Sequence, residues 1–220
     1  MPPDWNSIEV VLLDMDGTLL DKHFDDHFWE EYVPRRYAEI HGLSIREATD
    51  RLLEHYRAHE GTLNWTDLDF WSDQLGLDIP ALKRQVDHLI AVHPHVVPFL
   101  DAVRRMGKKI YLVTNAHGKT LDLKMEKTSL SGKFHGIYTS HELGAPKEQR
   151  RCWEVLRYRT GFDPERTLLA EDTLAILESA AGFGIRYLVY IAKSSSSRPA
   201  GRSTRFYSID TFREIMPEER

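Results

Sequence analysis

Two aspartates one residue apart, Asp14 and Asp16, follow a short apolar run near the start of the sequence. Ligands of open α/β sheets bind beyond the carboxyl ends of the strands, so acids at such a position are placed for chemistry. Neighbouring residues of a strand point to opposite faces, but Gly17 permits a sharp turn that lets both carboxylates serve one site. The pattern predicts a pair of reactive carboxylates, and the alternative is an ordinary surface turn.

Three further polar clusters follow apolar runs later in the sequence. Thr114 and Asn115 carry a hydroxyl and an amide that can donate to phosphate oxygens, although such pairs are also common in turns. Lys147 follows a proline and can reach an anion near a helix end, whereas a solvated surface lysine is the alternative. Glu171 and Asp172 are costly at a buried strand end unless they bind a cation such as Mg²⁺; a helix cap is the other interpretation.

Short apolar runs rich in β-branched residues are typical of buried parallel strands. We predict strands at residues 9–14, 109–114, 136–140, 167–171 and 186–191, and a short final strand and helix within 206–217. Helical patterns separate the strands at residues 97–109, 119–130, 148–161 and 174–184. This alternation predicts an α/β fold with a doubly wound parallel sheet, in which the four polar clusters meet at one edge.

A long helical and aromatic-rich stretch, residues 21–93, interrupts this alternation after the first strand. It is too long for a structureless loop, so we predict a helical cap domain at residues 21–93. Residues 1–20 and 94–220 are then expected to form the α/β core domain. The serine-rich residues 193–203 are expected to be a mobile surface loop, remote from the reactive residues.

The 220-residue chain has 29 lysines and arginines against 34 aspartates and glutamates, a formal charge of −5. This mild acidity argues against general binding to nucleic acids or anionic membranes, so an anionic substrate needs a local positive feature. No apolar run approaches the ~20 residues of a membrane span, and the first residues do not have the pattern of a signal peptide. The single cysteine, Cys152, suits a reducing compartment, and we expect a cytoplasmic protein.

The motifs DMDGTL, LVTNA, GAPK and AEDT have the order and spacing found in the haloacid dehalogenase-like hydrolase superfamily, which the sequence resembles over nearly its whole length. The helical insertion after the first motif is similar to the family's first type of cap. The resemblance implies covalent phosphoryl transfer in which Asp14 attacks phosphorus and forms an aspartyl-phosphate. It also implies that Asp16 protonates the leaving oxygen and then activates water for the second step.

The same resemblance assigns the remaining polar residues to a metal and to the phosphate. It implies Mg²⁺ held by Asp14, the backbone carbonyl of Asp16, and Asp172. Thr114 and the N–H group of Asn115 are expected to bind phosphate oxygens, and Lys147 to neutralise charge on Asp14 and the phosphoryl group. Many relatives have Asp-Asp or Gly-Asp where this sequence has Glu-Asp, so Glu171 is expected either to bind the metal or to orient water around it.

Three segments, residues 23–34, 61–78 and 114–130, more closely resemble bacterial GMP/IMP nucleotidases, which are cytoplasmic purine 5′-nucleotidases of this superfamily. In such a site aromatic rings stack on the purine and polar neighbours read its edge. The candidate substrate contacts are Phe24, Asp25, Asn64, Trp65 and His117. The alternative places the aromatic residues in the cap's own core, and His117 at a helix start.

Several other activities remain as alternatives. The resemblance argues against a dehalogenase, because those enzymes lack an acid at the position of Asp16. It argues against a phosphonatase, because the cap lysines Lys22 and Lys83 lie in no motif of that kind. Hydrolysis of purine nucleoside 5′-monophosphates is the leading prediction. Another small phosphomonoester, a sugar-phosphate mutase reaction, or a non-catalytic phosphate-binding module are the alternatives. The sequence does not indicate an oligomeric state.

Overall fold

The computed structural model describes residues 2–218 and contains a six-stranded, entirely parallel sheet. Its strands are β1 (Val10–Leu13), β2 (Lys109–Thr114), β3 (Gly136–Thr139), β4 (Thr167–Glu171), β5 (Tyr187–Ile191) and β6 (Tyr207–Ile209). The spatial order β3-β2-β1-β4-β5-β6 reverses direction beside β1, which makes the sheet doubly wound and confirms the predicted fold class. The bounds of β2 and β4 are those predicted, β1, β3 and β5 are shorter than predicted, and β6 lies within the predicted segment 206–217.

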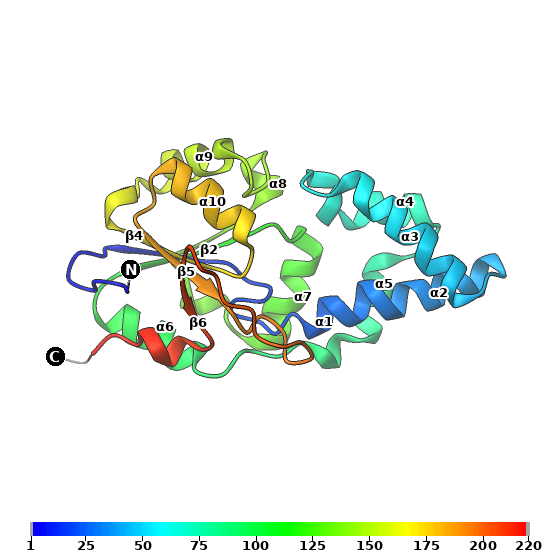
Figure 1. Cartoon of the computed structure of the whole chain (residues 1–220), viewed down its shortest axis with the longest axis horizontal. Helices are drawn as coiled ribbons and strands as arrows, with labels where there is room; N and C mark the ends of the chain where they lie inside the picture. Colours follow the sequence, from blue (N-terminus) through cyan, green and yellow to red (C-terminus); the bar gives the residue numbers. More distant parts are fainter. Residues whose placement is uncertain (1, 219–220) are drawn as a thin grey trace.

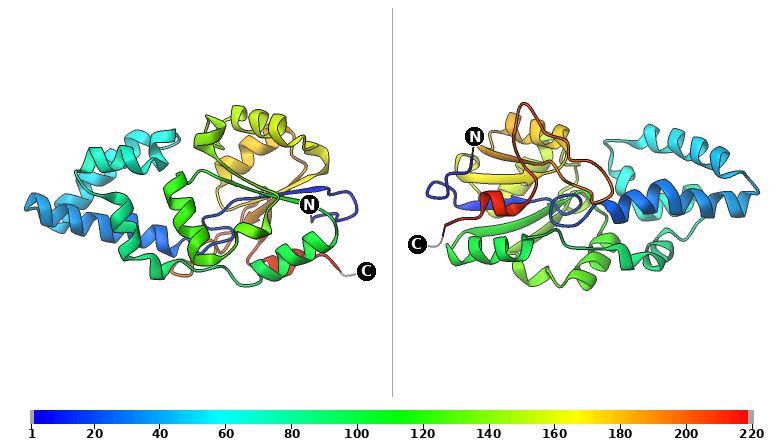
Figure 2. Two further views of the ribbon diagram at one scale, coloured as in Figure 1. Left: turned by 180° about the vertical axis from the view of Figure 1, so that it is seen from behind. Right: turned by 60° about the horizontal axis from the view of Figure 1, so that its bottom comes forward.

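Helices follow the strands and cover both faces of the sheet. They are α6 (Val96–Arg105), α7 (Gly118–Thr128), α8 (Ser140–Leu143), α9 (Arg150–Thr160) and α10 (Leu174–Phe183), with 3₁₀ turns η4 (Ser131–Lys133), η5 (Pro164–Arg166) and η6 (Phe212–Ile215). Figures 1 and 2 show α9 and α10 on one face and α6 with η6 on the other. The predicted last helix is only the 3₁₀ turn η6. No helix in the described part of the chain combines the length and apolar character needed to cross a membrane.

Alternating side chains of the central strand enter two separate cores. Val11 and Leu13 pack with α6, and Val10 and Leu12 pack with α9 and α10. All four residues of β1 are buried, as expected for a strand covered on both faces. The buried strand fixes the position of the loop that follows it, which carries the first acidic motif.

The regular structure between β1 and α6 is entirely helical. It consists of α1 (His23–His27), the π-helix η1 (Phe28–Tyr32), α2 (Val33–His41), α3 (Ile45–His59), η2 (Leu63–Thr66), α4 (Leu68–Leu75), α5 (Ile79–Gln85) and η3 (Asp87–Leu89). We call these elements together the helical insertion; they extend away from the sheet in Figure 1. They enclose a core of their own, to which α7 contributes Leu123. In α3 the buried residues are Ala48, Leu52 and Tyr56, the spacing of one helix face.

Residues 193–203 form no helix or strand, but they do not lie apart from the reactive residues. The carbonyl of Ser194 accepts a hydrogen bond from the N–H of Lys22, and the N–H of Ser196 donates to Asp21. Arg198 forms ion pairs with Asp26 and Glu30 of the helical insertion. The prediction that this segment is remote from the first motif is therefore wrong, because serine-rich composition gives no information on long-range contacts.

Candidate active site

The carboxyl ends of β1, β2 and β4 lie side by side and gather the predicted polar residues. Leu13 of β1 pairs with Leu112 of β2 and with Ala170 of β4. Asp14 and Glu171 directly follow two of these paired positions, so they leave the sheet at the same edge. The topology of the sheet thus brings together acids that are far apart in the sequence.

The turn after β1 depends on Gly17. Its φ is +84°, a conformation that residues with a side chain rarely adopt. A Cβ atom at this position would also lie 2.3 Å from Oδ2 of Asp172 and 3.1 Å from Cβ of Ser194. Glycine therefore allows the loop of the first acidic motif to pack directly on Asp172.

Lys147 joins two of the strand-end acids through its ammonium group. Nζ of Lys147 lies 2.5 Å from Oδ1 of Asp14 and 2.7 Å from Oε2 of Glu171, and all three side chains are buried. Burial disfavours charge on Lys147, but the carboxylates of Asp14 and Glu171 outweigh this effect and raise the pKa of its ammonium group. Lys147 is therefore a permanent cation beside Asp14 at neutral pH.

Three carboxylates form a compact acidic group at this point. Asp14, Glu171 and Asp172 each offer an oxygen, and these atoms all lie within 4.8 Å of one another. Burial, reinforced by Asp172 and opposed by Lys147, raises the pKa of Asp14. Burial and the charge of Asp14 likewise raise the pKa of Glu171 well above its ordinary value. Partly buried carboxylate oxygens at this spacing are the donor set that Mg²⁺ prefers, so the residues fit this ion.

Glu171 and Asp172 have different surroundings within this group. Oε1 of Glu171 accepts hydrogen bonds from the backbone N–H groups of Asp172 and Thr173, and Oε2 accepts from Lys147. Asp172 instead pairs with Lys22, whose Nζ lies 2.9 Å from Oδ2. Both oxygens of Glu171 are thus held by the protein, and Asp172 contacts a lysine from the start of the helical insertion.

Thr114 and Asn115 connect the end of β2 with the loop that carries Lys147. The buried hydroxyl of Thr114 accepts a hydrogen bond from the N–H of Ala116, 3.0 Å away. Oδ1 of Asn115 accepts from the N–H of Lys147 at 3.0 Å, and its Nδ2 donates to Glu148. The Asn115 side chain therefore orients the Lys147 loop, a contact that the sequence did not indicate.

Asp16 belongs to a second, separate group of charges. Nζ of Lys124, from α7, lies 2.5 Å from Oδ1 of Asp16 and 2.5 Å from Oδ2 of Asp25. Nζ of Lys83, from α5, lies 2.9 Å from the other oxygen of Asp25. Burial, opposed by Lys124, raises the pKa of Asp16 to about 6. A carboxyl with a pKa near neutrality can both donate and accept a proton under physiological conditions.

Lys83 is enclosed by aromatic rings within the helical insertion. Its Nζ lies 4.8 Å from the ring centre of Phe24, 4.6 Å from that of Phe28 and 5.4 Å from that of Trp29. Burial lowers the pKa of Lys83, although its partner Asp25 acts in the opposite direction. A series of ion pairs thus links the first motif to the interior of the helical insertion, and it runs from Asp16 through Lys124 and Asp25 to Lys83.

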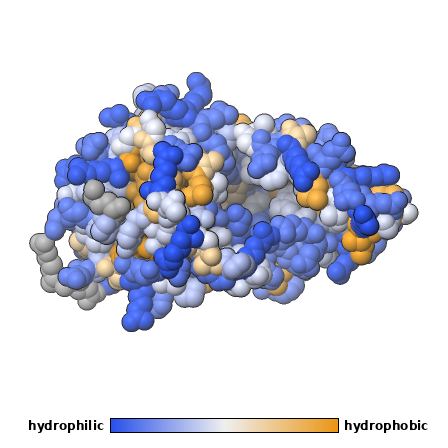
Figure 3. Space-filling model, viewed as in Figure 1, coloured by the Kyte–Doolittle hydropathy of each residue, from blue (hydrophilic) through white to orange (hydrophobic). Residues whose placement is uncertain are grey.

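A cavity of about 820 Å³ opens beside the two charged groups, lined by residues from both the sheet edge and the helical insertion. Figure 3 shows the surface hollowed between these two parts of the molecule. Asp14, Lys147 and Asp172 line one end, and Tyr56 and Trp65 belong to the part formed by the insertion. Such a volume accommodates a small organic molecule.

The predicted substrate contacts take different positions around this cavity. Trp65 lines it and is 38% exposed, and His117 lines it at the N-terminal cap of α7. Asp25 also lines it, but both of its oxygens are held by lysines. Asn64 is exposed and is not among the lining residues.

Phe24 requires a correction. Its ring is 1% exposed, does not line the cavity and packs in the core of the helical insertion beside Phe28. The predicted stacking of this residue on a base is wrong, because the ring has no face open to a ligand. The alternative, that this aromatic residue belongs to the core of the insertion, is the correct one.

Sequence reasoning also missed residues that the fold brings to the site. Lys124 falls in a predicted helix and gives no local signal of its pairing with Asp16. Tyr56 of α3 is among the residues that line the cavity, and its hydroxyl oxygen is buried and has no hydrogen-bond partner in the described structure. Asp67 and His141 lie close to His117.

A parallel α/β sheet with acids at the ends of β1 and β4, a lysine between them and a helical insertion after β1 defines a class of hydrolases. The chain belongs to the haloacid dehalogenase-like hydrolases, whose family model matches residues 8–184. It is 38% identical over 213 residues to the GMP/IMP nucleotidase YrfG of Escherichia coli, covering 97% of this chain and 96% of that protein. These similarities make the chain an enzyme of the phosphomonoesterase class.

Solved structures agree with this assignment. The HAD phosphatase from Thermococcus onnurineus superimposes with a TM-score of 0.80 at 25% identity, covering 94% of this chain and 96% of that chain. A HAD-superfamily hydrolase from Geobacter sulfurreducens has a TM-score of 0.64 at 18% identity, covering 95% of each chain, and shows the shared fold alone.

Proposed function

We propose that the enzyme is a Mg²⁺-dependent phosphatase that hydrolyses purine nucleoside 5′-monophosphates such as GMP and IMP through an aspartyl-phosphate. The observation that carries the chemistry is the contact between Asp14 and Lys147 at the strand edge, 2.5 Å long and open to the cavity. The likeness to a GMP/IMP nucleotidase over nearly the whole chain supports the substrate class.

The first step is attack by Asp14 on phosphorus, with Lys147 offsetting the repulsion between the carboxylate and the phosphate oxygens. Asp16 gives its proton to the leaving ribose oxygen and then takes a proton from the water that attacks the phosphoenzyme. A pKa of about 6 for Asp16 allows both roles. Thr114 and the N–H of Asn115 are proposed to hold the phosphate oxygens at the end of β2.

Asp14, the backbone carbonyl of Asp16, and Asp172 are the residues proposed to hold Mg²⁺. When bound, the ion offsets the negative charge that the acids and the phosphate bring together. Glu171 is proposed to orient the environment of the ion rather than to ligate it, because both of its oxygens already accept hydrogen bonds. Its carboxylate also holds Lys147 in place beside Asp14.

Residues 21–93 are proposed to act as a cap domain over a core domain of residues 1–20 and 94–220. The cavity lies between the two, so a bound nucleotide places its phosphate at the sheet edge and its base against the cap. Trp65 is proposed to stack on the base, since its ring is partly exposed at the cavity.

The cytoplasm is the proposed compartment, in keeping with the buried, unpaired thiol of Cys152. A small phosphomonoester rather than a nucleic acid is the proposed partner, in keeping with the net charge of −5.

Release of inorganic phosphate from a panel of phosphomonoesters tests this proposal. With Mg²⁺ present, GMP and IMP should give a higher kcat/KM than pyrimidine nucleotides, sugar phosphates and p-nitrophenyl phosphate. A clear preference for a sugar phosphate would contradict the nucleotidase proposal and retain only the phosphatase chemistry. Phosphate migration within a sugar phosphate without release would indicate a mutase, and binding without turnover of any ester would indicate a phosphate-binding module.

A further inference from the structure

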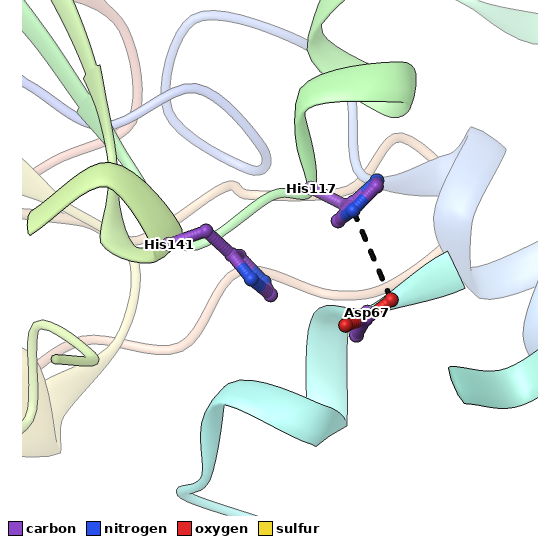
Figure 4. A group of neighbouring side chains, drawn as sticks. All are labelled: Asp67, His117 and His141. Atoms are coloured by element: carbon purple, nitrogen blue, oxygen red, sulfur yellow. Dashed lines mark ion pairs between the residues drawn. The ribbon is translucent and has the colours of Figure 1, made fainter. Parts of the chain in front are cut away.

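Three side chains from elements that are separate in the sequence meet beside the cavity, which His117 also lines. Asp67 is the N-terminal cap of α4, His117 is the N-terminal cap of α7, and His141 lies in α8 (Figure 4). One potential ligand atom from each lies within 4.8 Å of the other two, and Nε2 of His117 is 3.8 Å from Oδ1 of Asp67. Asp67 belongs to the helical insertion, whereas both histidines belong to the sheet part.

The donor set is that of a transition-metal ion. Two imidazoles and a carboxylate suit Zn²⁺ far better than Mg²⁺, which prefers oxygen ligands. Ligands at ~2.0–2.1 Å from a tetrahedral ion lie about 3.4 Å from one another, so separations of up to 4.8 Å need to contract by at most about 1.4 Å. Three protein ligands would leave the fourth position for water.

Local contacts hold the side chains in place for this role. Oδ1 of Asp67 accepts from the N–H groups of Asp69 and Phe70, which fixes the carboxylate at the start of α4. Nε2 of His141 lies 3.1 Å from the hydroxyl of Thr66. The rings of His117 and His141 are perpendicular, with centres 5.1 Å apart.

The surroundings of His141 favour the neutral imidazole that binds metals. Burial, reinforced by the neighbouring His117 and opposed by Asp67, lowers the pKa of His141. Nδ1 of His117 lies 3.4 Å from the N–H of Lys119. This contact orients the ring, whose Nε2 lies on the side of Asp67.

We propose that Asp67, His117 and His141 form a binding site for a transition-metal ion of the Zn²⁺ type, separate from the acidic group at Asp14. Because its ligands come from both parts of the molecule, a bound ion joins the helical insertion to the sheet part and opposes opening of the cavity. This second consequence rests on the proposed function, in which residues 21–93 act as a cap over the substrate, and on motion of that cap.

Binding is tested by titrating the full-length protein with Zn²⁺ in a large excess of Mg²⁺, using calorimetry, and by nitrogen NMR of the histidine rings. We expect one Zn²⁺ per chain and shifted ring nitrogens of His117 and His141. H141Q should lower the Zn²⁺ affinity at least about tenfold, and D67N should act in the same direction. The matched control H55Q, at an exposed histidine of the insertion, should bind as the unaltered protein does.

Equal Zn²⁺ affinity in H141Q and H55Q would overturn the proposal. It would also be overturned if D172N lost Zn²⁺ binding and Zn²⁺ did not shift the ring nitrogens of His117 and His141 in the unaltered protein. Thermal unfolding without metal checks that the variants are folded. Phosphate release in Mg²⁺ gives the second readout, since added Zn²⁺ should slow the unaltered enzyme and H55Q more than H141Q. Equal slowing of all three would contradict the effect on opening. The binding and NMR results stand even if the protein hydrolyses no phosphomonoester, which separates this test from that of the proposed function.

Discussion

Replacing Lys83 by methionine probes the buried charges that link the first motif to the helical insertion. Methionine keeps much of the length and apolar surface of the lysine stem but removes its charge. Lys83 is 2% exposed and its ammonium group pairs with Asp25 at 2.9 Å. Removing one partner of a buried ion pair typically costs about 3–5 kcal/mol. Because Asp25 keeps Lys124 as a partner, we expect the lower end of this range, about 3 kcal/mol.

Thermal and urea unfolding of Lys83→Met at neutral pH measure this loss. In a chain of 220 residues each kcal/mol corresponds to about 2–4 °C, so Tm should fall by roughly 6–12 °C. Asp25→Asn should also destabilise the protein, because it leaves Lys83 without its carboxylate. The double variant should cost less than the sum of the two single changes by about 1–3 kcal/mol, since it removes both partners of one pair.

Lys119→Met is the matched control. Lys119 pairs with Asp69 at 2.5 Å, but its side chain is 50% exposed, so this change should cost less than about 1 kcal/mol. A similarly small cost for Lys83→Met, or strictly additive costs in the double variant, would refute the reasoning that the Lys83 charge is stabilised by Asp25. Equal m-values for all variants are needed for this comparison.

Three other predictions concern the metal, the base and acid stability. Removing Mg²⁺ with EDTA should stop phosphate release, and full activity after chelation would contradict the metal assignment. Asp172→Ala should also stop phosphate release, whereas Glu171→Gln should retain more activity. Trp65→Ala should raise the KM for GMP by the equivalent of about 1–3 kcal/mol with little change for p-nitrophenyl phosphate, whereas equal loss on both would contradict stacking of the ring on the base. Burial alone would raise the pKa of Asp25, but the charges of Lys124 and Lys83 outweigh burial and hold this pKa below 3.8. The ionised Asp25 carboxylate therefore stabilises the fold above pH 3.8, and this contribution is lost as the pH falls below that value. The difference in unfolding free energy between Asp25→Asn and the unaltered protein should therefore be greatest at neutral pH and shrink below pH ~4, and a constant difference would argue against the pairing.

The sheet could be predicted from the sequence because each buried strand is a short apolar run with a polar end. The runs at β2 and β4 gave the observed bounds, and strand–helix alternation gave the doubly wound parallel class of the sheet. The topology then implied that Asp14 and Glu171 leave the sheet at the same edge. The last helix was overestimated, since the apolar residues around Phe212 support only a single 3₁₀ turn.

Side-chain partners across the molecule could not be predicted in the same way. Lys124 lies on a helix whose pattern gives burial but not the identity of the carboxylates that it meets. Phe24 has the residue type of a base-stacking group, yet only packing shows that its ring is enclosed. Asp67 and His141 come together through the arrangement of the insertion on the sheet, for which one sequence contains no periodic signal.

Transfer of the phosphoryl group to Asp14 is the step on which the proposed mechanism depends. It is tested most directly by mixing enzyme, Mg²⁺ and GMP carrying a radiolabelled phosphate, quenching with acid within the first turnover, and mapping the label by mass spectrometry. We predict one labelled phosphoryl group on the peptide that contains Asp14, and none in Asp14→Asn, which should also lose more than about a hundredfold in turnover. Label on another residue, or rapid turnover by the asparagine variant, would contradict covalent catalysis by Asp14.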